Sequence, residues 1–172
     1  DGNGRIGRIL IPLFLYQKRA LSQPMFYLSE YLENHREGYY QRLKAISADG
    51  DWNGWLVFFL QAIAIQATQN SERVTAIQAL YEEMKLAIQA ATRSQYTVHV
   101  LDAIFNKPIF RSSDLAQQLF REFGIHEKTG QGLLRQMRDT GILRELRPGS
   151  GRRPSTLCFP RLINLAEGRT VI

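Results

Sequence analysis

Apolar residues recur at intervals of three and four along most of this chain, and this spacing restricts it to a mainly helical fold. Single apolar faces at 56–67 and 74–88 predict two amphipathic helices. A further helix is predicted at 29–46, with Ser29 as its cap. The nearly continuous apolar residues at 5–20 predict a helix that is buried on several sides.

The helical pattern changes after residue 92. Shorter elements are predicted from there on, which are helices at 97–106, 113–123 and 127–140 and strands at 142–146 and 156–159. The turn between the two strands is rich in Gly, Pro and Arg. Three short helices and a β-hairpin with a basic tip predict a winged helix-turn-helix domain. We therefore place a domain boundary near Arg93, which divides the chain into domains at 1–91 and 92–172.

The composition limits the location and the partners of the protein. No apolar run approaches the roughly 20 residues of a membrane-spanning helix. There is no signal peptide, and the single Cys158 has no partner for an internal disulfide, so we expect a cytoplasmic protein without membrane contact. The net charge of +6 favours an anionic partner such as nucleic acid or a nucleotide. The net charge has a second explanation, which is that of a soluble protein with a modest excess of arginine.

The first eight residues, Asp1 to Arg8, are the part of the sequence that points most directly to a chemistry. Glycines on both sides of Asn3 let the backbone approach a ligand closely, and the N–H groups of the helix that follows favour a phosphate. Arg5 and Arg8 lie on the first helical turn and can reach the same anion. Asp1 is a hard oxygen ligand suited to Mg²⁺ beside the phosphates. A capped turn before a solvated arginine face accounts for the same spacing.

This stretch, D-G-N-G-R-I-G-R, resembles the second half of the signature of the Fic family of nucleotidyl-transfer proteins. Other segments are similar to the same family, which are L-S-Q-P at 21–24, Y-L-S at 27–29, R-E-G-Y-Y at 36–40 and G-D-W at 50–52 with the following Trp55. The resemblance covers roughly the first half of the chain. It implies that 1–91 is the carboxyl-terminal part of a Fic-type helical core, which is followed by the winged helix.

The resemblance implies a protein adenylyltransferase, which transfers AMP from ATP with Mg²⁺ to a hydroxyl side chain of a target protein. Asp1 would hold the metal ion, and Arg5 and Arg8 would neutralise the β- and γ-phosphates. Arg8 would also pair with the inhibitory glutamate that many family members carry. The nucleotide-binding residues implied by the resemblance are Gly2, Asn3, Gly4, Arg5, Arg8 and Tyr39. A packing role in an amphipathic helix is open for Tyr39 as well.

The family's catalytic base is a histidine four positions before the metal ligand, a position that would lie upstream of Asp1. The resemblance therefore places no catalytic residue in this chain, and we expect no AMP transfer from these residues alone. His35, His99 and His126 do not match the position of the motif histidine. They are expected to be surface or packing residues.

The helix predicted at 127–140 has one apolar face and one charged face. Residues expected to be buried are Gly130, Leu133, Leu134, Met137 and Gly141. Candidate DNA-binding residues on the outer face and at the hairpin tip are Lys128, Arg135, Arg138, Arg152 and Arg153. Asp139 places a negative charge on the same outer face. Winged helices also form protein contacts, so DNA binding, an intramolecular contact and a homodimer contact are all open.

Three functions are compatible with these features. The first is the adenylyltransferase, with the winged helix as an accessory domain. The second is a DNA-binding regulator in which the Fic-like half senses a nucleotide. The third is another nucleotidyl or phosphate transfer on the same scaffold. The retained Asp1 and the arginines of the phosphate-binding stretch favour the first.

Overall fold

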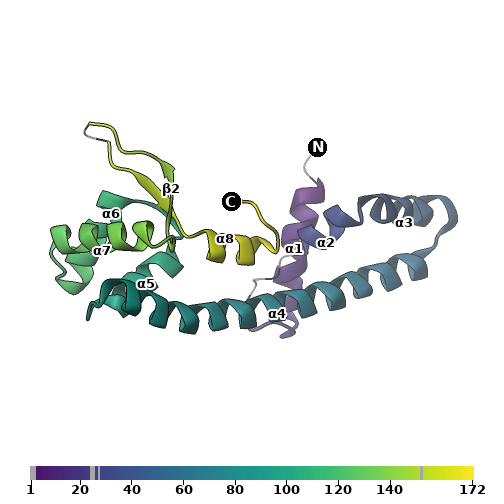
Figure 1. The fold of residues 1–172 in the computed structure, drawn as a ribbon. Coiled ribbons are helices and arrows are strands. Elements are labelled where there is room, and N and C mark those ends of the chain that lie inside the picture. The colour runs from purple at the N-terminus through teal and green to yellow at the C-terminus, as the bar shows by residue number, and fades with distance from the viewer. Residues whose placement is uncertain (1–2, 24–25, 27, 152) are drawn as a thin grey trace. The chain divides into compact units, whose positions relative to one another are not determined.

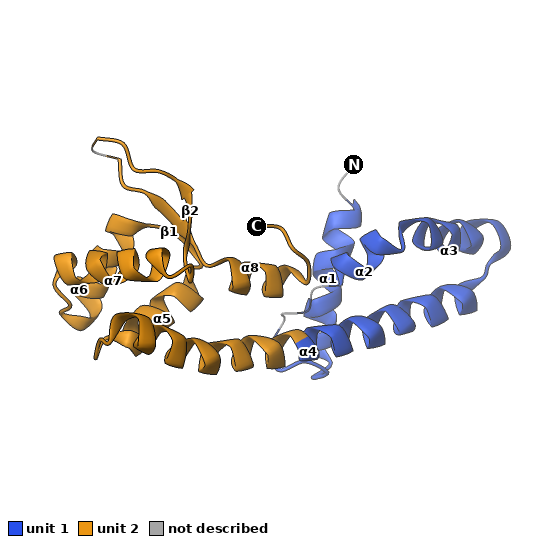
Figure 2. Ribbon diagram, in the orientation of Figure 1, with its two compact units in different colours: residues 1–72 blue, residues 73–172 orange. Residues whose placement is uncertain are grey.

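A computed structural model describes residues 3–23, 26, 28–151 and 153–172, and they form a mainly helical protein with one small antiparallel sheet (Figure 1). This confirms the predicted fold class at that level. The chain divides by packing into an amino-terminal unit, Asp1–Glu72, and a carboxyl-terminal unit, Arg73–Ile172 (Figure 2). This division falls inside the long helix α4, Trp52–Thr92, whereas the predicted domain boundary lies just after that helix.

The amino-terminal unit contains the helices α1 (Asn3–Gln17), α2 (Ser29–Asn34) and α3 (Arg36–Asp49) and the first part of α4. A single helix at 29–46 was the wrong prediction, because the backbone leaves the helical region at His35. The His35 N–H donates to the carbonyl of Tyr31 at 3.0 Å, which closes α2. Ser29 is the first residue of α2 and not its cap, since Leu28 occupies the cap position.

A tight turn at Gly50 connects α3 to α4. Gly50 adopts a left-handed conformation with φ of 68° and ends α3. Asp51 then accepts a hydrogen bond of 2.8 Å from the N–H of Gly54 on the first turn of α4. A glycine ends one helix and an aspartate begins the next because each satisfies backbone groups that the helix ends leave unpaired.

Helix α4 is a single element of 41 residues. The two apolar faces at 56–67 and 74–88 were predicted to be separate helices, and they belong to this one helix. Residues 68–73 between them contain neither glycine nor proline, so no helix-breaking residue interrupts the backbone hydrogen bonds. The helix buries Ala62 and the polar Gln66 in the amino-terminal unit. In the carboxyl-terminal unit it buries apolar side chains such as Ile88.

Helix α1 is far more exposed than its sequence predicted. None of its residues is buried, and side chains such as Ile9 (62%) and Phe14 (56%) are more than half exposed. Among the described residues of this unit, the buried cluster consists of Leu28, Leu32 and Ala62, and Ile11 is the residue of α1 that packs against it. The expectation of burial on several sides is therefore wrong here, because this cluster meets only the side of α1 that carries Ile11.

The carboxyl-terminal unit is built around three short helices and a sheet, as predicted to within about two residues. Its elements are α5 (Thr97–Asn106), β1 (Ile109–Arg111), α6 (Ser112–Phe123), α7 (Glu127–Asp139), β2 (Arg144–Arg147), β3 (Thr156–Cys158) and α8 (Pro160–Glu167). The sheet has the order β1-β3-β2, and both pairings are antiparallel. Strand β1 and helix α8 are additions that the sequence analysis did not predict.

One continuous core of eighteen buried residues holds this unit together. It draws Leu134 and Met137 from α7, Leu119 from α6 and Leu157 from β3, and α4 contributes Ile88. Burial of this much apolar surface is the main favourable term in folding. The core positions α7 so that its opposite face is turned to solvent.

Two surface contacts tie α4 to the rest of the carboxyl-terminal unit. The hydroxyl of Tyr81 donates a short hydrogen bond to Asp102 on α5, and this bond, together with burial and the negative charge of Asp102, raises the pKa of Tyr81 to about 12. Arg161 on α8 donates two hydrogen bonds to Glu83, at 2.6 and 2.7 Å. These bonds and the guanidinium charge lower the pKa of the Glu83 carboxyl.

None of the helices that the structure describes combines the length and hydrophobicity that a bilayer-spanning helix needs.

Candidate functional site

The phosphate-binding stretch predicted from the sequence lies at the start of α1. Asp1 and Gly2 fall outside the described residues. Asn3 is the first residue of α1, and Gly4 and Arg5 follow it in exposed positions on the first turn. Asn3 and Gly4 thus lie inside α1, whereas the sequence predicted a loop there and a helix from residue 5 on.

Arg8 lies between two hollows of the amino-terminal unit. The apolar hollow has a volume of about 520 Å³ and is lined by Arg5, Arg8, Ile9, Leu13, Phe26 and Leu28. The polar hollow has a volume of about 460 Å³ and is lined by Arg8, Ser29, Glu33, Arg36, Tyr39 and Tyr40. Ser29 lines both hollows as well. Arg8 can therefore contact a ligand that occupies either one.

The structure brings Tyr39 and Arg8 to the same polar hollow, although 30 residues of sequence separate them. Tyr39 is also half-buried, and its ring lies 5.6 Å from that of Trp55. The two roles that the sequence left open for Tyr39 are compatible, since one side of the ring packs and the residue still lines the hollow.

Arg36 and Tyr40 also line the polar hollow and were not predicted as site residues. The guanidinium carbon of Arg36 lies 5.7 Å from the ring centre of Tyr40, and Tyr40 itself is 55% exposed. Arg36 also forms a long ion pair of 3.7 Å with Glu33. An arginine followed by two tyrosines on one helical turn was the only sequence signal available, and the hollow itself depends on how α1, α2 and α3 pack.

Helix α2 is held in place by a buried side chain of α4. Gln66 is fully buried, and its carbonyl oxygen accepts a hydrogen bond of 3.1 Å from the N–H of Tyr31. Its amide nitrogen donates to Asn70 at 3.0 Å and to Glu30 at 3.4 Å. A buried amide that makes all these bonds fixes the local geometry, because leaving any of its groups unpaired would cost free energy. The first turn of α2, and with it Ser29, is thereby fixed.

The three histidines have local packing contacts instead of a shared site. His35 stacks on Tyr31 with the ring centres 4.0 Å apart, and His99 stacks on Phe123 at 4.2 Å. His126 precedes α7, and its ring nitrogen accepts a hydrogen bond from the N–H of Lys128. These are the surface and packing roles that the sequence predicted. Within the described part of the chain, no group of three or more His, Cys, Asp or Glu residues is arranged to hold a metal ion.

The second candidate site is the outer face of α7. Gly130, Leu133, Leu134 and Met137 are buried on the inner face, as predicted. Gly141 is exposed, because α7 ends at Asp139 and the chain turns there with a φ of 78° at the glycine. Lys128 and Arg135 are exposed, as the candidate DNA-binding role requires.

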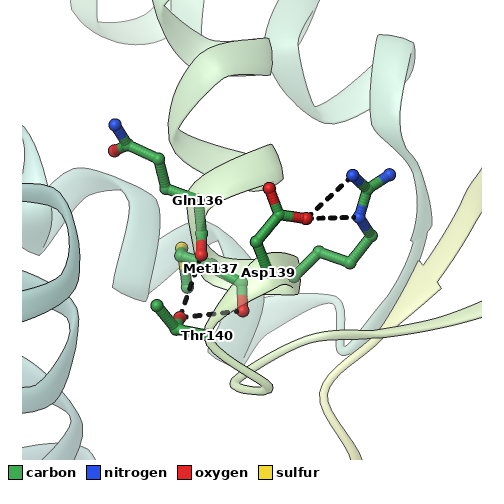
Figure 3. A network of polar contacts seen from close by, with 5 residues as sticks. Gln136, Met137, Asp139 and Thr140 are labelled. Carbon is green, nitrogen blue, oxygen red and sulfur yellow. Dashed lines mark hydrogen bonds and ion pairs between the residues drawn. The ribbon is translucent and has the colours of Figure 1, made fainter.

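Arg138 and Asp139 neutralise each other at the end of α7. The Nε and Nη2 atoms of Arg138 donate to one carboxylate oxygen of Asp139 at 3.0 and 2.8 Å (Figure 3). Thr140 closes the same helix end, since its hydroxyl donates to the carbonyls of Gln136 and Met137. Because Arg138 is paired with Asp139, its charge is less available to an anionic ligand of this face. The same pairing reduces the repulsion between Asp139 and such a ligand.

The hairpin contributes further cations. Arg153 is exposed, and its backbone pairs with that of Ser150 in an antiparallel β-bridge near the tip. Arg152 lies outside the described residues. Strand β2 adds Arg144 and Arg147, which are exposed and were not predicted as contact residues. The basic residues therefore extend along the hairpin as well as along α7.

No known protein-family model matches this chain. The resemblance to the Fic family therefore depends on the segments quoted from the first half of the sequence.

Proposed function

We propose that this chain is the carboxyl-terminal part of a Fic-type protein adenylyltransferase, in which a helical Fic core precedes a winged helix. The protein would transfer AMP from ATP, with Mg²⁺, to a hydroxyl side chain of a target protein. The observation that carries this proposal is the placement of Arg5 and Arg8 beside one hollow at the start of α1, directly after the glycine-rich stretch.

The arginines would bind and orient the phosphates of the nucleotide. Arg5 and Arg8 lie on the first two turns of one helix, so their guanidinium groups can contact neighbouring phosphates. Positive charge at this point stabilises the negative charge that develops on the leaving pyrophosphate. Asp1 is the residue that would hold the metal ion, whose chemistry is to neutralise the phosphates. The motif histidine, upstream of Asp1 by the resemblance, would accept the proton of the target hydroxyl.

The proposal is tested by AMP transfer from α-labelled ATP in a version of the protein that includes the motif histidine. We expect label on protein in the wild type and its loss in Arg5→Ala. Lys18→Ala is the matched control, because Lys18 is an exposed cation just beyond the end of α1 and lines neither hollow. Absence of label, in the presence and in the absence of any inhibitory glutamate, would contradict the transferase.

A second candidate function is DNA binding by the carboxyl-terminal unit, and the distribution of charge favours it. Residues 73–172 contain fifteen Lys and Arg against nine Asp and Glu, whereas residues 1–72 contain seven of each kind. The whole net charge of +6 thus lies in the unit that carries α7 and the hairpin. An excess of positive charge of this kind attracts the phosphates of nucleic acid.

The DNA candidate is tested by the salt dependence of binding to duplex DNA. Removal of one phosphate contact, for example by Arg153→Ala at the hairpin tip, is expected to lower the slope of log affinity against log salt by about one. Arg169→Ala is the control, since Arg169 is exposed at the far end of this unit, beyond α8. If no duplex binds at low salt, the winged helix is a contact domain, and sedimentation would show whether it forms a homodimer.

A further inference from the structure

Helix α7 contains two glycines, and the packing of the carboxyl-terminal unit accounts for one of them. Gly130 is buried, and a side-chain carbon placed on it would lie 3.4 Å from the Cα atom of Ala116. A glycine at this position therefore lets α7 pack closely on α6. Gly132 is exposed, and among the described residues nothing packs within 4 Å of the carbon that a side chain would add there. Packing gives no reason for a glycine at 132.

Gly132 also lowers the stability of the helix that contains it. It is the sixth of the 13 residues of α7, so it is not a cap at either end. Glycine inside a helix is less stable than alanine, because the unfolded chain has more backbone freedom to lose at a glycine. Alanine would fit the open space around this position. A residue that destabilises a helix without a packing reason is expected at a functional surface.

The residues around Gly132 on the helix surface are polar or positively charged. The helical spacing of three and four residues places Lys128, Thr129, Arg135 and Gln136 around it. All four are exposed. Neither the Lys128 nor the Arg135 side chain forms an ion pair with a residue that the structure describes. Gly132 is thus a gap in the middle of a polar face with unpaired cations on both sides.

This face suits duplex nucleic acid better than it suits another protein. A protein contact buries apolar side chains at its centre, but the large apolar residues of α7, which are Leu133, Leu134 and Met137, are all buried on the inner face. Phosphates and base edges match the cations, hydroxyl and amide of the outer face. The major groove is about 12 Å wide and a helix with its side chains is about 10–12 Å across. In so close a fit, one missing side chain lets the helix backbone lie nearer to the bases.

We propose that Gly132 is the point of closest approach between α7 and duplex DNA. Because this position has no side chain, the backbone of α7 lies against the groove, and Lys128 and Arg135 bind on either side of the contact. The depth of this contact also sets which base edges Thr129 and Gln136 reach. The inference rests on the second candidate function, since it assumes that the carboxyl-terminal unit binds DNA.

The test compares stability with DNA affinity in the 172-residue chain. The DNA is a duplex that the wild type enriches from a random pool at low salt, and its affinity is measured by fluorescence anisotropy. Gly132→Ala is expected to raise the thermal midpoint by about 2–4 °C, because alanine favours the helix. The same variant should weaken the duplex roughly ten-fold, because the added carbon holds the helix away from the groove. A purely structural glycine would not change stability and affinity in opposite directions.

Gly7→Ala is the matched control. Gly7 lies inside α1, is exposed, and among the described residues has nothing packed within 4 Å of an added side-chain carbon. It belongs to the amino-terminal unit, so its substitution should leave the duplex affinity unchanged.

Four other results would overturn the inference, and they separate it from the candidate function. If Gly132→Ala leaves the affinity unchanged while Arg135→Ala weakens it, α7 binds DNA without a close approach at Gly132. If Gly132→Ala lowers the thermal midpoint, the glycine serves the fold. If sedimentation shows a wild-type homodimer that Gly132→Ala disrupts, the face is a protein contact. If the wild type enriches no duplex, both the inference and the DNA-binding function fail.

Discussion

The two units of this protein differ in how many of their apolar side chains are buried. In the carboxyl-terminal unit, eighteen buried residues form one continuous core. Among the described residues of the amino-terminal unit, the corresponding cluster has three buried members, which are Leu28, Leu32 and Ala62, and half-buried aromatic side chains surround it. Helix α1 leaves most of its apolar surface exposed.

This difference suggests a division of roles. The carboxyl-terminal unit contributes most of the buried core that stabilises the fold, and the amino-terminal unit contains the hollows that could hold a ligand. The dense core accounts for the fold of the carboxyl-terminal unit, and its surface is then free to carry the net positive charge. The sparse packing of the amino-terminal unit leaves the hollows beside Arg8 open. Regions with few buried apolar contacts open more readily, so the candidate nucleotide site is expected in the less stable unit.

The largest expected effect comes from a leucine in the dense core. Leu134→Ala removes a side chain that is 1% exposed, and we expect it to lower the free energy of unfolding by about 2–5 kcal/mol. The same change at Leu10, which is 56% exposed on α1, should cost no more than about 0.5 kcal/mol. Urea denaturation followed by circular dichroism measures both. If Leu10→Ala costs as much as Leu134→Ala, α1 is packed in solution and the comparison between the units fails.

The next largest effect tests how α4 begins in the sparse unit. Asp51→Ala removes the side chain that accepts the Gly54 N–H, and loss of such a cap typically costs about 0.5–2 kcal/mol. A side-chain carbon at Gly54 would overlap the carboxylate of Asp51, so Gly54→Ala should break the same bond. The double variant is therefore expected to cost little more than the worse single variant. Strictly additive losses in urea denaturation would show that the two residues act separately.

The sequence predicted the dense unit better than the sparse one, because local signals suffice where each element has a clear apolar face. The helices at 97–106, 113–123 and 127–140 and the hairpin agree with the structure to within about two residues. Helix α8 could have been found as well, since Pro160 begins it and Gly168 ends it. Strand β1 is only three residues long, which is too short for a periodic pattern.

In the amino-terminal unit, the features that the sequence did not predict depend on how helices distant in the sequence pack together. The apolar residues of α1 indicate burial, but composition does not say which neighbour covers them. The break between α2 and α3 at His35 could not be predicted, because no glycine or proline lies at that position. Arg36 and Tyr40 line the polar hollow only because α1, α2 and α3 meet there. The bond between Arg138 and Asp139 depends on side-chain conformations, which the spacing of residues does not determine.

A smaller effect is expected from the Tyr81 contact on the surface of the dense unit. Tyr81→Phe removes the hydrogen bond to Asp102 and should cost about 0.5–1.5 kcal/mol at neutral pH. The folded pKa of about 12 lies above the ordinary value of 10.0, so the bond contributes fully below pH 10.0 and its contribution is lost as the pH rises to about 12. Absorbance titration of the tyrosines should lose its highest-pKa component in the variant. An unchanged titration curve would contradict this contact.

The smallest effect is expected from the exposed pair of Glu83 and Arg161. Because hydrogen bonds from Arg161 lower the pKa of Glu83, the pair stabilises the fold above the ordinary pKa of 4.5, and this contribution is lost as the pH falls through the lower folded value. Glu83→Gln should therefore lower the thermal midpoint slightly at pH 7, and the difference should vanish in acid. Glu145→Gln, at an exposed carboxylate of β2, is the control and should show no such dependence. A loss at pH 7 as large as that of Leu134→Ala would mean that surface charge pairs stabilise this unit as much as its core does, which exposed pairs rarely do.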